Sequence, residues 1–270
     1  MNNIGKNYLD IRYMDTLASG DTSLHRLDPR AKLITTLIFL VTVISYSKYS
    51  ILPLVPFFIY PVVMISAGGL PAGYFLKKVI QVSPFAIMVG IFNPLIDREI
   101  ILHIGTIGIS GGWVSFCSII IRFILTVTAA LILISLTGFN TVCEALNRLG
   151  VPRPFVVQLL FFYRYIFVLV DEAERMERAR SLRSFDSRSR PFKVFISIIG
   201  HLLLRSFDRA ERIYNAMRCR GFEGHIPMIR EIRMHWRDFL FMAGWSLLFI
   251  LFRFDNIPAR LGGIVMEALK

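Results

Sequence analysis

The sequence predicts an all-α polytopic membrane protein with about five transmembrane helices and a cytoplasmic module of two long helices. Hydrophobic residues make up 54% of the 270 residues, and the mean hydropathy is +0.57. Charged residues make up only 19%, below the roughly 25% typical of a soluble domain. The charge is also concentrated, because residues 164–237 hold 16 of the 31 Lys and Arg side chains. The long uncharged stretches elsewhere are therefore membrane candidates.

The composition excludes several classes of protein. The three cysteines are too widely spaced for a disulfide framework or a CxxC metal site: Cys117, Cys143 and Cys219. We expect each of them to behave as a small, buried, apolar side chain. The chain is polar up to Lys32, so no cleavable signal peptide is expected. An isoelectric point near 10.0 would suit a nucleic-acid-binding protein. The hydropathy excludes a soluble one, and we expect no nucleic-acid partner.

Five uncharged stretches are long enough, or nearly long enough, to span a bilayer. A hydrocarbon core about 30 Å thick needs roughly 20 apolar residues in a helix. The stretches are residues 33–47, 49–76, 79–96, 123–143 and 239–252. Three prolines break or kink the second stretch, which follows the first after a tight turn at Lys48. The last has only 14 residues, and we expect its flanking Trp and Arg side chains to extend it by snorkelling.

The distribution of Lys and Arg predicts the orientation of these spans, because short basic loops stay cytoplasmic. Basic side chains precede the first and third spans: Lys6, Arg12, Arg26, Arg30, Lys32, Lys77 and Lys78. The turn at Lys48 and the segment 97–113, which holds Arg98 alone, are poor in them. The N-terminus is therefore predicted to be cytoplasmic.

These predictions divide the chain into four parts. Residues 1–30 form a cytoplasmic N-terminal tail and residues 31–140 a membrane domain with four spans. Residues 141–235 form the cytoplasmic module, and residues 236–270 form the last span and a C-terminal tail. Part of the basic charge of the module is expected to face anionic headgroups of the lipid bilayer.

The module contains two predicted helices of similar pattern. Residues 154–183 have no Gly or Pro after the first residue, which predicts one helix about 45 Å long, apolar first and charged later. Residues 191–220 predict an amphipathic helix. Gly221 then occupies the position where a left-handed residue ends a helix.

Both predicted helices end in an arginine beside small residues. The first end is Ala179, Arg180 and Ser181, or alternatively Arg183 and Ser184, and the second is Cys219, Arg220 and Gly221. An arginine at a helix end, followed by a small residue that lets another backbone approach, suits docking onto a carboxylate of a partner protein. The alternative is a capped helix end with a solvated arginine.

The segment before the first span has the pattern of a helix start. Asp28 fits the N-cap and Pro29 the first helical position. With His25, Arg30 and Lys32, these residues are expected to anchor the first span. The alternative is that the segment from His25 to Lys32 only holds the span at the lipid headgroups.

The sequence has no pattern typical of catalysis or cofactor binding. It has no GxxxxGK[ST] phosphate loop, so we expect no ATP hydrolysis, no enzyme activity and no cofactor in this chain. The five histidines, His25, His103, His201, His225 and His235, are isolated from one another, and no metal site is expected. Arg122 is the one clear charge inside a predicted span. It lies near the outer end of the fourth span, where we expect snorkelling, with internal pairing as the alternative.

Three segments carry a resemblance to a known family: SLHRLDPRAKL (residues 23–33), ERARSLRSF (177–185) and AMRCRGFEG (216–224). They resemble the transmembrane T component of energy-coupling factor transporters. The segment YMDTLASGDTSLHRLDPR (13–30) is most similar to the cobalt and nickel (CbiQ-type) branch. The resemblance covers essentially the whole chain.

The resemblance implies a coupling subunit in a bacterial or archaeal cytoplasmic (inner) membrane. In that family, two cytoplasmic coupling helices insert their ends into grooves on two ABC-type ATPase subunits, which bind the ATP. The membrane bundle holds a small substrate-binding (S) subunit. The S subunit chooses the substrate, so the sequence of this chain does not identify it.

An Ala-Arg-Gly motif makes the ATPase contact in that family, and it falls on the two arginine ends. The second end departs from the motif at Cys219. The first departs at Ser181, unless the register is Arg183 and Ser184, which the match of Arg-Ser-Phe with Arg-Gly-Phe favours. The register stays open.

Three functions remain at this point. The first is the T subunit of an importer of cobalt or nickel, and the second is the T subunit of a vitamin importer. The third is a self-sufficient secondary transporter whose basic insert binds lipid. Such a transporter should have paired intramembrane charges or an inverted repeat, and neither is visible.

Overall fold

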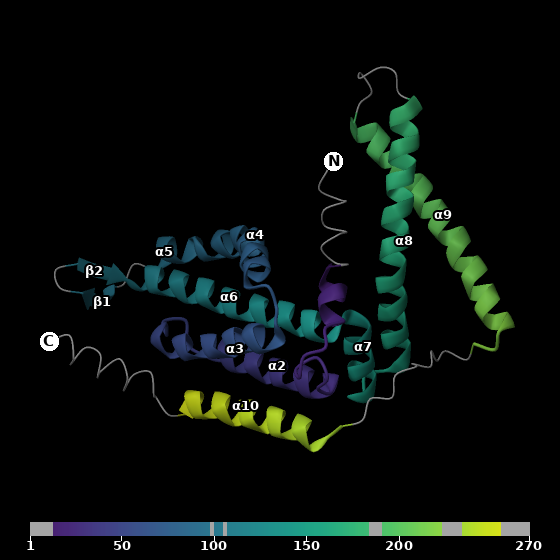
Figure 1. Cartoon of the computed structure of the whole chain (residues 1–270). Coiled ribbons are helices and arrows are strands. Elements are labelled where there is room, and N and C mark those ends of the chain that lie inside the picture. The colour runs from purple at the N-terminus through teal and green to yellow at the C-terminus, as the bar shows by residue number, and fades with distance from the viewer. Residues whose placement is uncertain (1–12, 98–99, 105–106, 184–190, 223–233, 255–270) are drawn as a thin grey trace. The chain divides into compact units, whose positions relative to one another are not determined.

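The computed structural model describes residues 13–97, 100–104, 107–183, 191–222 and 234–254 (Figure 1). The chain divides into two compact units. Residues 14–138 and 232–270 form the first, which we call the membrane unit, and residues 1–13 and 139–231 form the second, which we call the helical-arm unit. The predicted fold class, an all-α membrane protein, is confirmed, with one short β-hairpin added to it.

The membrane unit is a bundle of helices around an aromatic core. Its elements are α2 (Pro29–Ile44), η1 (Leu52–Phe58), α3 (Ile59–Gly68), α4 (Ala72–Gly90), α5 (Phe92–Ile96), β1 (Ile100–Ile104), β2 (Ile107–Ser110), α6 (Gly111–Thr137) and α10 (Trp236–Phe254). Helix α2 packs against α6 and α10, and α4 packs against α6. Phe39 in α2, Phe57 in η1 and Phe249 in α10 are fully buried against one another and against Tyr60. These rings join segments that lie far apart in the sequence.

Among the described residues, three helical segments are long and apolar enough to cross a membrane: Ala72–Pro94, Gly111–Thr137 and Arg153–Leu182. The first two correspond to the third and fourth predicted spans. The third lies in α8, which the sequence pattern assigns to the cytoplasmic module. Leu52–Gly68 is a shorter apolar segment.

The predicted limits of the second and fourth spans are wrong. Helix α6 begins at Gly111, not at residue 123, because Arg122 continues the helix rather than ending it. It ends at Thr137, since Gly138 adopts a left-handed φ of 78°. The stretch 49–76 is not one span either. It contains the 3₁₀ helix η1, then α3, and a left-handed Gly69 separates α3 from α4.

The segment between α5 and α6 contains the antiparallel hairpin of β1 and β2. Gly112 follows it in the first turn of α6. A Cβ there would lie 2.5 Å from Cα of Pro94 and 2.6 Å from the carbonyl oxygen of Asp97. Only glycine therefore lets α6 approach the end of α5 this closely.

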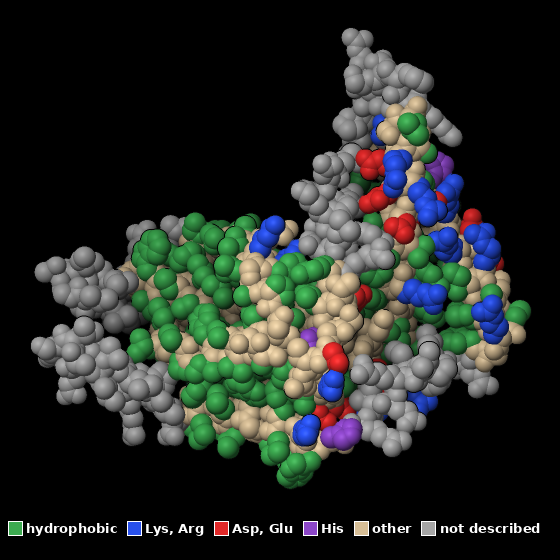
Figure 2. All heavy atoms as spheres, viewed as in Figure 1, with side chains coloured by type: hydrophobic (Ala, Val, Ile, Leu, Met, Phe, Trp, Pro, Cys, Tyr) green, Lys and Arg blue, Asp and Glu red, His purple; other side chains and the backbone are tan. Residues whose placement is uncertain are grey.

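The helical-arm unit contains α7 (Phe139–Arg148), α8 (Arg153–Arg183) and α9 (Pro191–Cys219). Helix α7 packs on α8, where the ring of Phe139 stacks on Tyr163 with centroids 4.3 Å apart. Only 6% of the apolar window of α8 is buried. Lys and Arg side chains gather on α8 and α9, whereas hydrophobic side chains cover much of the visible face of the membrane unit (Figure 2).

Candidate functional site

The end of α9 is a Schellman cap built on Gly221. The N–H of Gly221 donates to the carbonyl of Arg218, and the N–H of Phe222 donates to the carbonyl of Met217, both at 3.0 Å. Gly221 has a left-handed φ of 76°, which glycine adopts without steric cost. Arg220, the residue between α9 and this glycine, has an exposed side chain. The cap therefore fixes the backbone of an arginine whose side chain is exposed.

The end of α8 is arranged differently. The helix continues to Arg183, so Ala179, Arg180 and Ser181 lie inside its last turns. Arg180 is half-buried and lines an open cleft of about 790 Å³ between α8 and α9. The hydroxyl of Ser181 donates to the carbonyl of Arg178 at 2.8 Å. Arg183 is the last described residue of α8, and its side chain, like Ser184, lies outside the described residues.

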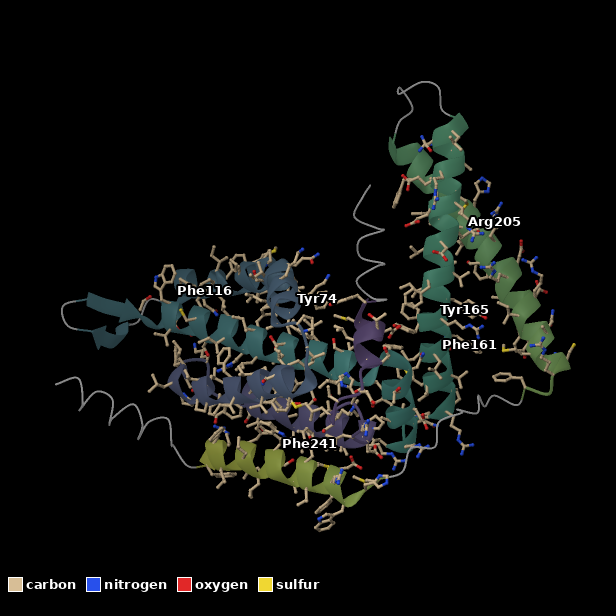
Figure 3. All side chains as sticks on the ribbon, in the orientation of Figure 1. Tyr74, Phe116, Phe161, Tyr165, Arg205 and Phe241 are labelled. Carbon is tan, nitrogen blue, oxygen red and sulfur yellow. The ribbon has the colours of Figure 1, made fainter. Side chains whose placement is uncertain are left out.

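An ion pair joins the two long helices near their middles. Arg205 on α9 donates to the carboxylate of Glu172 on α8 (Figure 3). The sequence analysis missed this contact, because the two residues lie 33 positions apart and carry no common motif. The ion pair links α8 and α9 at this level.

The second candidate group surrounds the start of α2. Asp28 is the N-cap, and its carboxylate accepts a hydrogen bond from the backbone N–H of Arg30 at 2.8 Å. Pro29 is the first residue of the helix. The backbone N–H of Asp28 donates to the carboxylate of Asp238 in α10 at 2.8 Å. Sequence reasoning did not single out Asp238, because no local pattern marks it as a partner of Asp28.

Lys32 is buried, with 2% of its surface exposed. Its ammonium donates to the carbonyl of Leu136 at 3.0 Å and to the carbonyl of His25 at 3.2 Å. Leu136 lies in the last turn of α6, where carbonyls lack intrahelical partners and a cation is favourable. The alternative of a headgroup anchor is therefore wrong for Lys32, which joins α2 to the end of α6.

His25 lies beside this group, in the segment before α2. Its Nε2 donates to the carbonyl of Leu17 at 2.9 Å, and its Nδ1 then accepts from the hydroxyl of Thr22 at 2.7 Å. Burial lowers the pKa of His25 below its usual value, since it disfavours the charged ring. The neutral imidazole satisfies both contacts.

Arg122 lies near the middle of α6, so the prediction of a position near the outer end of the helix is wrong. Its guanidinium donates to the backbone carbonyl of Ser47 in the turn after α2. Arg253 of α10 donates to the carbonyl of Ser45 in the same turn at 3.2 Å. Arg122 therefore makes a hydrogen bond within the protein, and snorkelling alone does not account for its position.

The environments of the three cysteines, and of side chains that could bind a metal ion, are the next feature of the structure. Cys143 is buried, and burial raises the pKa of its thiol to about 11. Cys117 and Cys219 are exposed, contrary to expectation, because they lie on helix faces turned away from the core. In the described ranges, no three His, Cys, Asp or Glu side chains are close enough to hold a metal ion.

Comparison with known proteins agrees with the sequence resemblance. The profile of the CbiQ family, described as cobalt transport protein, matches residues 20–230. The energy-coupling factor transporter transmembrane protein EcfT of Bacillus subtilis is 25% identical over 246 residues, covering 84% of this chain and 91% of the relative. EcfT of Ruminiclostridium cellulolyticum is 28% identical over 251 residues, covering 86% and 91%. The nickel permease LarQ of Lactiplantibacillus plantarum is 30% identical over 118 residues, covering 44% and 43%.

Proposed function

Because the chain belongs to the CbiQ family of cobalt transport proteins, we propose that it is the transmembrane coupling (T) component of an energy-coupling factor importer. Two ABC-type ATPase subunits and a small membrane S subunit are its partners. The ATPase subunits bind and hydrolyse ATP, and this chain has no cofactor of its own. Relatives named EcfT that match more than four fifths of the chain support this proposal.

The exposed Arg220 at the capped end of α9 is the observation that carries the proposal. A guanidinium held just past a helix end can meet a carboxylate of an ATPase subunit through two parallel hydrogen bonds. Helices α8 and α9, with 31 and 29 residues, are long enough to carry a displacement of their tips over tens of ångströms. Arg180 or Arg183, in the last turns of α8, is the corresponding candidate on the other helix.

Arg220→Ala tests this docking role. Losing one charge-assisted contact should cost roughly 1.5–3 kcal/mol of binding, so co-purification of the ATPase subunits and substrate uptake should both fall. Arg220→Lys should rescue only in part, because an ammonium cannot reproduce the planar fork. Arg164→Ala removes the same charge from an exposed position on α8, far from either tip and outside the clefts between the helices. Equal losses for Arg220→Ala and Arg164→Ala would mean that a diffuse basic surface, rather than the tip, binds the partner.

We further propose cobalt or nickel as the cargo, supported by the family description and by the name of the nickel permease relative. Uptake of ⁵⁷Co and ⁶³Ni by cells with and without the chain tests this directly. Uptake of a vitamin instead would assign the chain to a vitamin importer. Metal uptake by the chain alone in vesicles, without ATPase subunits, would indicate a self-sufficient transporter.

The proposed location is a bacterial or archaeal inner membrane, with a cytoplasmic N-terminus. Cysteines introduced singly at Ser110 and Ser187 test this orientation through labelling of intact cells with a membrane-impermeant maleimide. The background must lack Cys117 and Cys219, which are exposed. We expect external labelling at position 110 only. Labelling at position 187 would reverse the orientation.

A further inference from the structure

An apolar wedge lies between α8 and α9, on the side of α8 that carries Phe161 and Tyr165 (Figure 3). We define it by Phe161, Tyr165 and Val168 of α8 and by Ala210, Ile213 and Met217 of α9. It is an open cleft of about 430 Å³, and Ser206 and Arg209 are the polar residues of its lining.

The wedge continues into a cationic cleft. This second cleft has a volume of about 240 Å³ and is lined by Arg205, Arg209 and Arg212, together with Glu172. Arg205 is paired with Glu172. No acidic side chain in the described part of the chain forms an ion pair with Arg209 or Arg212. Because Arg209 lines both clefts, the apolar wedge lies next to the guanidinium groups of Arg209 and Arg212.

The wedge, although open on one side, is large enough to hold part of a thin apolar chain. An apolar cavity of about 150 Å³ holds a benzene molecule, and the wedge therefore has space for a length of acyl chain. Lipid is also at hand, because the apolar part of α8 has the length and composition of a membrane span and is 6% buried.

We propose that the wedge and the cationic cleft bind one anionic phospholipid. The acyl chain lies in the wedge, and the phosphate accepts hydrogen bonds from Arg209 and Arg212. A lipid held there fills the space between α8 and α9 beside their ion-paired contact, and so stiffens the pair. This inference does not rest on the proposed transport function.

Native mass spectrometry of the full-length chain, released from nanodiscs of equal phosphatidylglycerol and phosphatidylcholine, tests the site. One retained phosphatidylglycerol is expected. Arg209→Gln and Arg212→Gln should each lower the preference for phosphatidylglycerol about fivefold, as expected for one arginine at an anionic lipid surface. Arg178→Gln is the matched control, since Arg178 is exposed, pairs with Glu174 and lines neither cleft.

Filling the wedge tests the acyl-chain part separately. Ile213→Trp should abolish retention of both phosphatidylglycerol and phosphatidylcholine. Ala210→Leu is a smaller change at the same wedge. It replaces the first variant if Ile213→Trp does not elute as a folded protein in gel filtration. Equal effects of Arg209→Gln and Arg178→Gln would overturn the proposal. Unchanged lipid retention in the folded wedge variants would also overturn it. Loss of a co-purifying membrane protein with unchanged lipid retention would identify the wedge as a protein interface instead.

Discussion

The backbone N–H of Asp28 donates to Oδ1 of Asp238, 210 positions farther along the chain, at 2.8 Å. Oδ2 of the same carboxylate accepts the backbone N–H of His235 at 2.7 Å. Asp238 thus serves the N-terminal ends of both α2 and α10, where backbone N–H groups lack partners and a negative charge is favourable. Both aspartates are buried, with 4% and 3% of their surfaces exposed. Helices α2 and α10 of the membrane unit are joined at this point.

Asp238→Ala should destabilise the membrane unit by about 1–3 kcal/mol for each N–H left without an acceptor. The thermal unfolding temperature of the detergent-purified chain measures the effect. Asp238→Asn should lose less, because its amide oxygen still accepts one of the two hydrogen bonds. Asp21→Ala, which removes an exposed carboxylate paired with Arg26, is the control and should leave the temperature unchanged. If both alanine variants unfold at the wild-type temperature, the link between α2 and α10 is not a stabilising one.

Lys32→Met should loosen the end of α6. The substitution leaves the carbonyls of Leu136 and His25 without their buried ammonium donor, at a cost of about 1.5–3 kcal/mol for a charge-assisted contact. Hydrogen–deuterium exchange should rise in residues 133–138 relative to the middle of α6. Lys77→Met changes an exposed lysine in α4 and should leave this exchange as it is. Equal exchange in both variants would contradict a capping role for Lys32.

Gly112→Ala should destabilise the junction of α5 and α6. The new methyl group would overlap backbone atoms of Asn93, Pro94 and Asp97 at 2.5–2.7 Å, and overpacking of this kind costs about 1–3 kcal/mol. Gly244→Ala in α10 has nothing within 4 Å of its Cβ and should instead stabilise the helix by roughly 0.5–1 kcal/mol. Opposite shifts in the guanidinium midpoint are expected. A stable Gly112→Ala protein would show that α6 can move away from α5 at no cost.

His25 should make the protein less stable at mildly acidic pH. Burial holds its pKa below the usual value in the folded chain, so the unfolded chain binds the proton first as the pH falls. The stability is full above the unfolded value of about 6.5 and decreases as the pH drops through it towards the folded pKa. Unfolding temperatures at pH 7.5 and 5.5 should differ less in His25→Gln than in the wild type. An identical pH dependence would assign the effect to other groups.

The sequence by itself determined the elements whose causes are local. Asp28 and Pro29 placed the start of α2, and Gly221 placed the end of α9, because caps and left-handed turns depend on residues within one helical turn. The absence of Gly and Pro determined the length of α8. The arginine at each helix end could also be named from sequence, although only the fold separates the half-buried Arg180 from the exposed Arg220.

The tertiary structure decided every feature whose partner is distant. Lys32 has its acceptor 104 positions away, Asp238 its donor 210 positions away, and Arg205 its carboxylate 33 positions away. It also decided where α6 begins, since Gly112 is needed only because the backbone of residues 93–97 lies against it. Sequence patterns such as helix caps predict the backbone conformation within about one helical turn. Burial and pairing depend on which segments pack together, and no residue's immediate neighbours in the chain determine that.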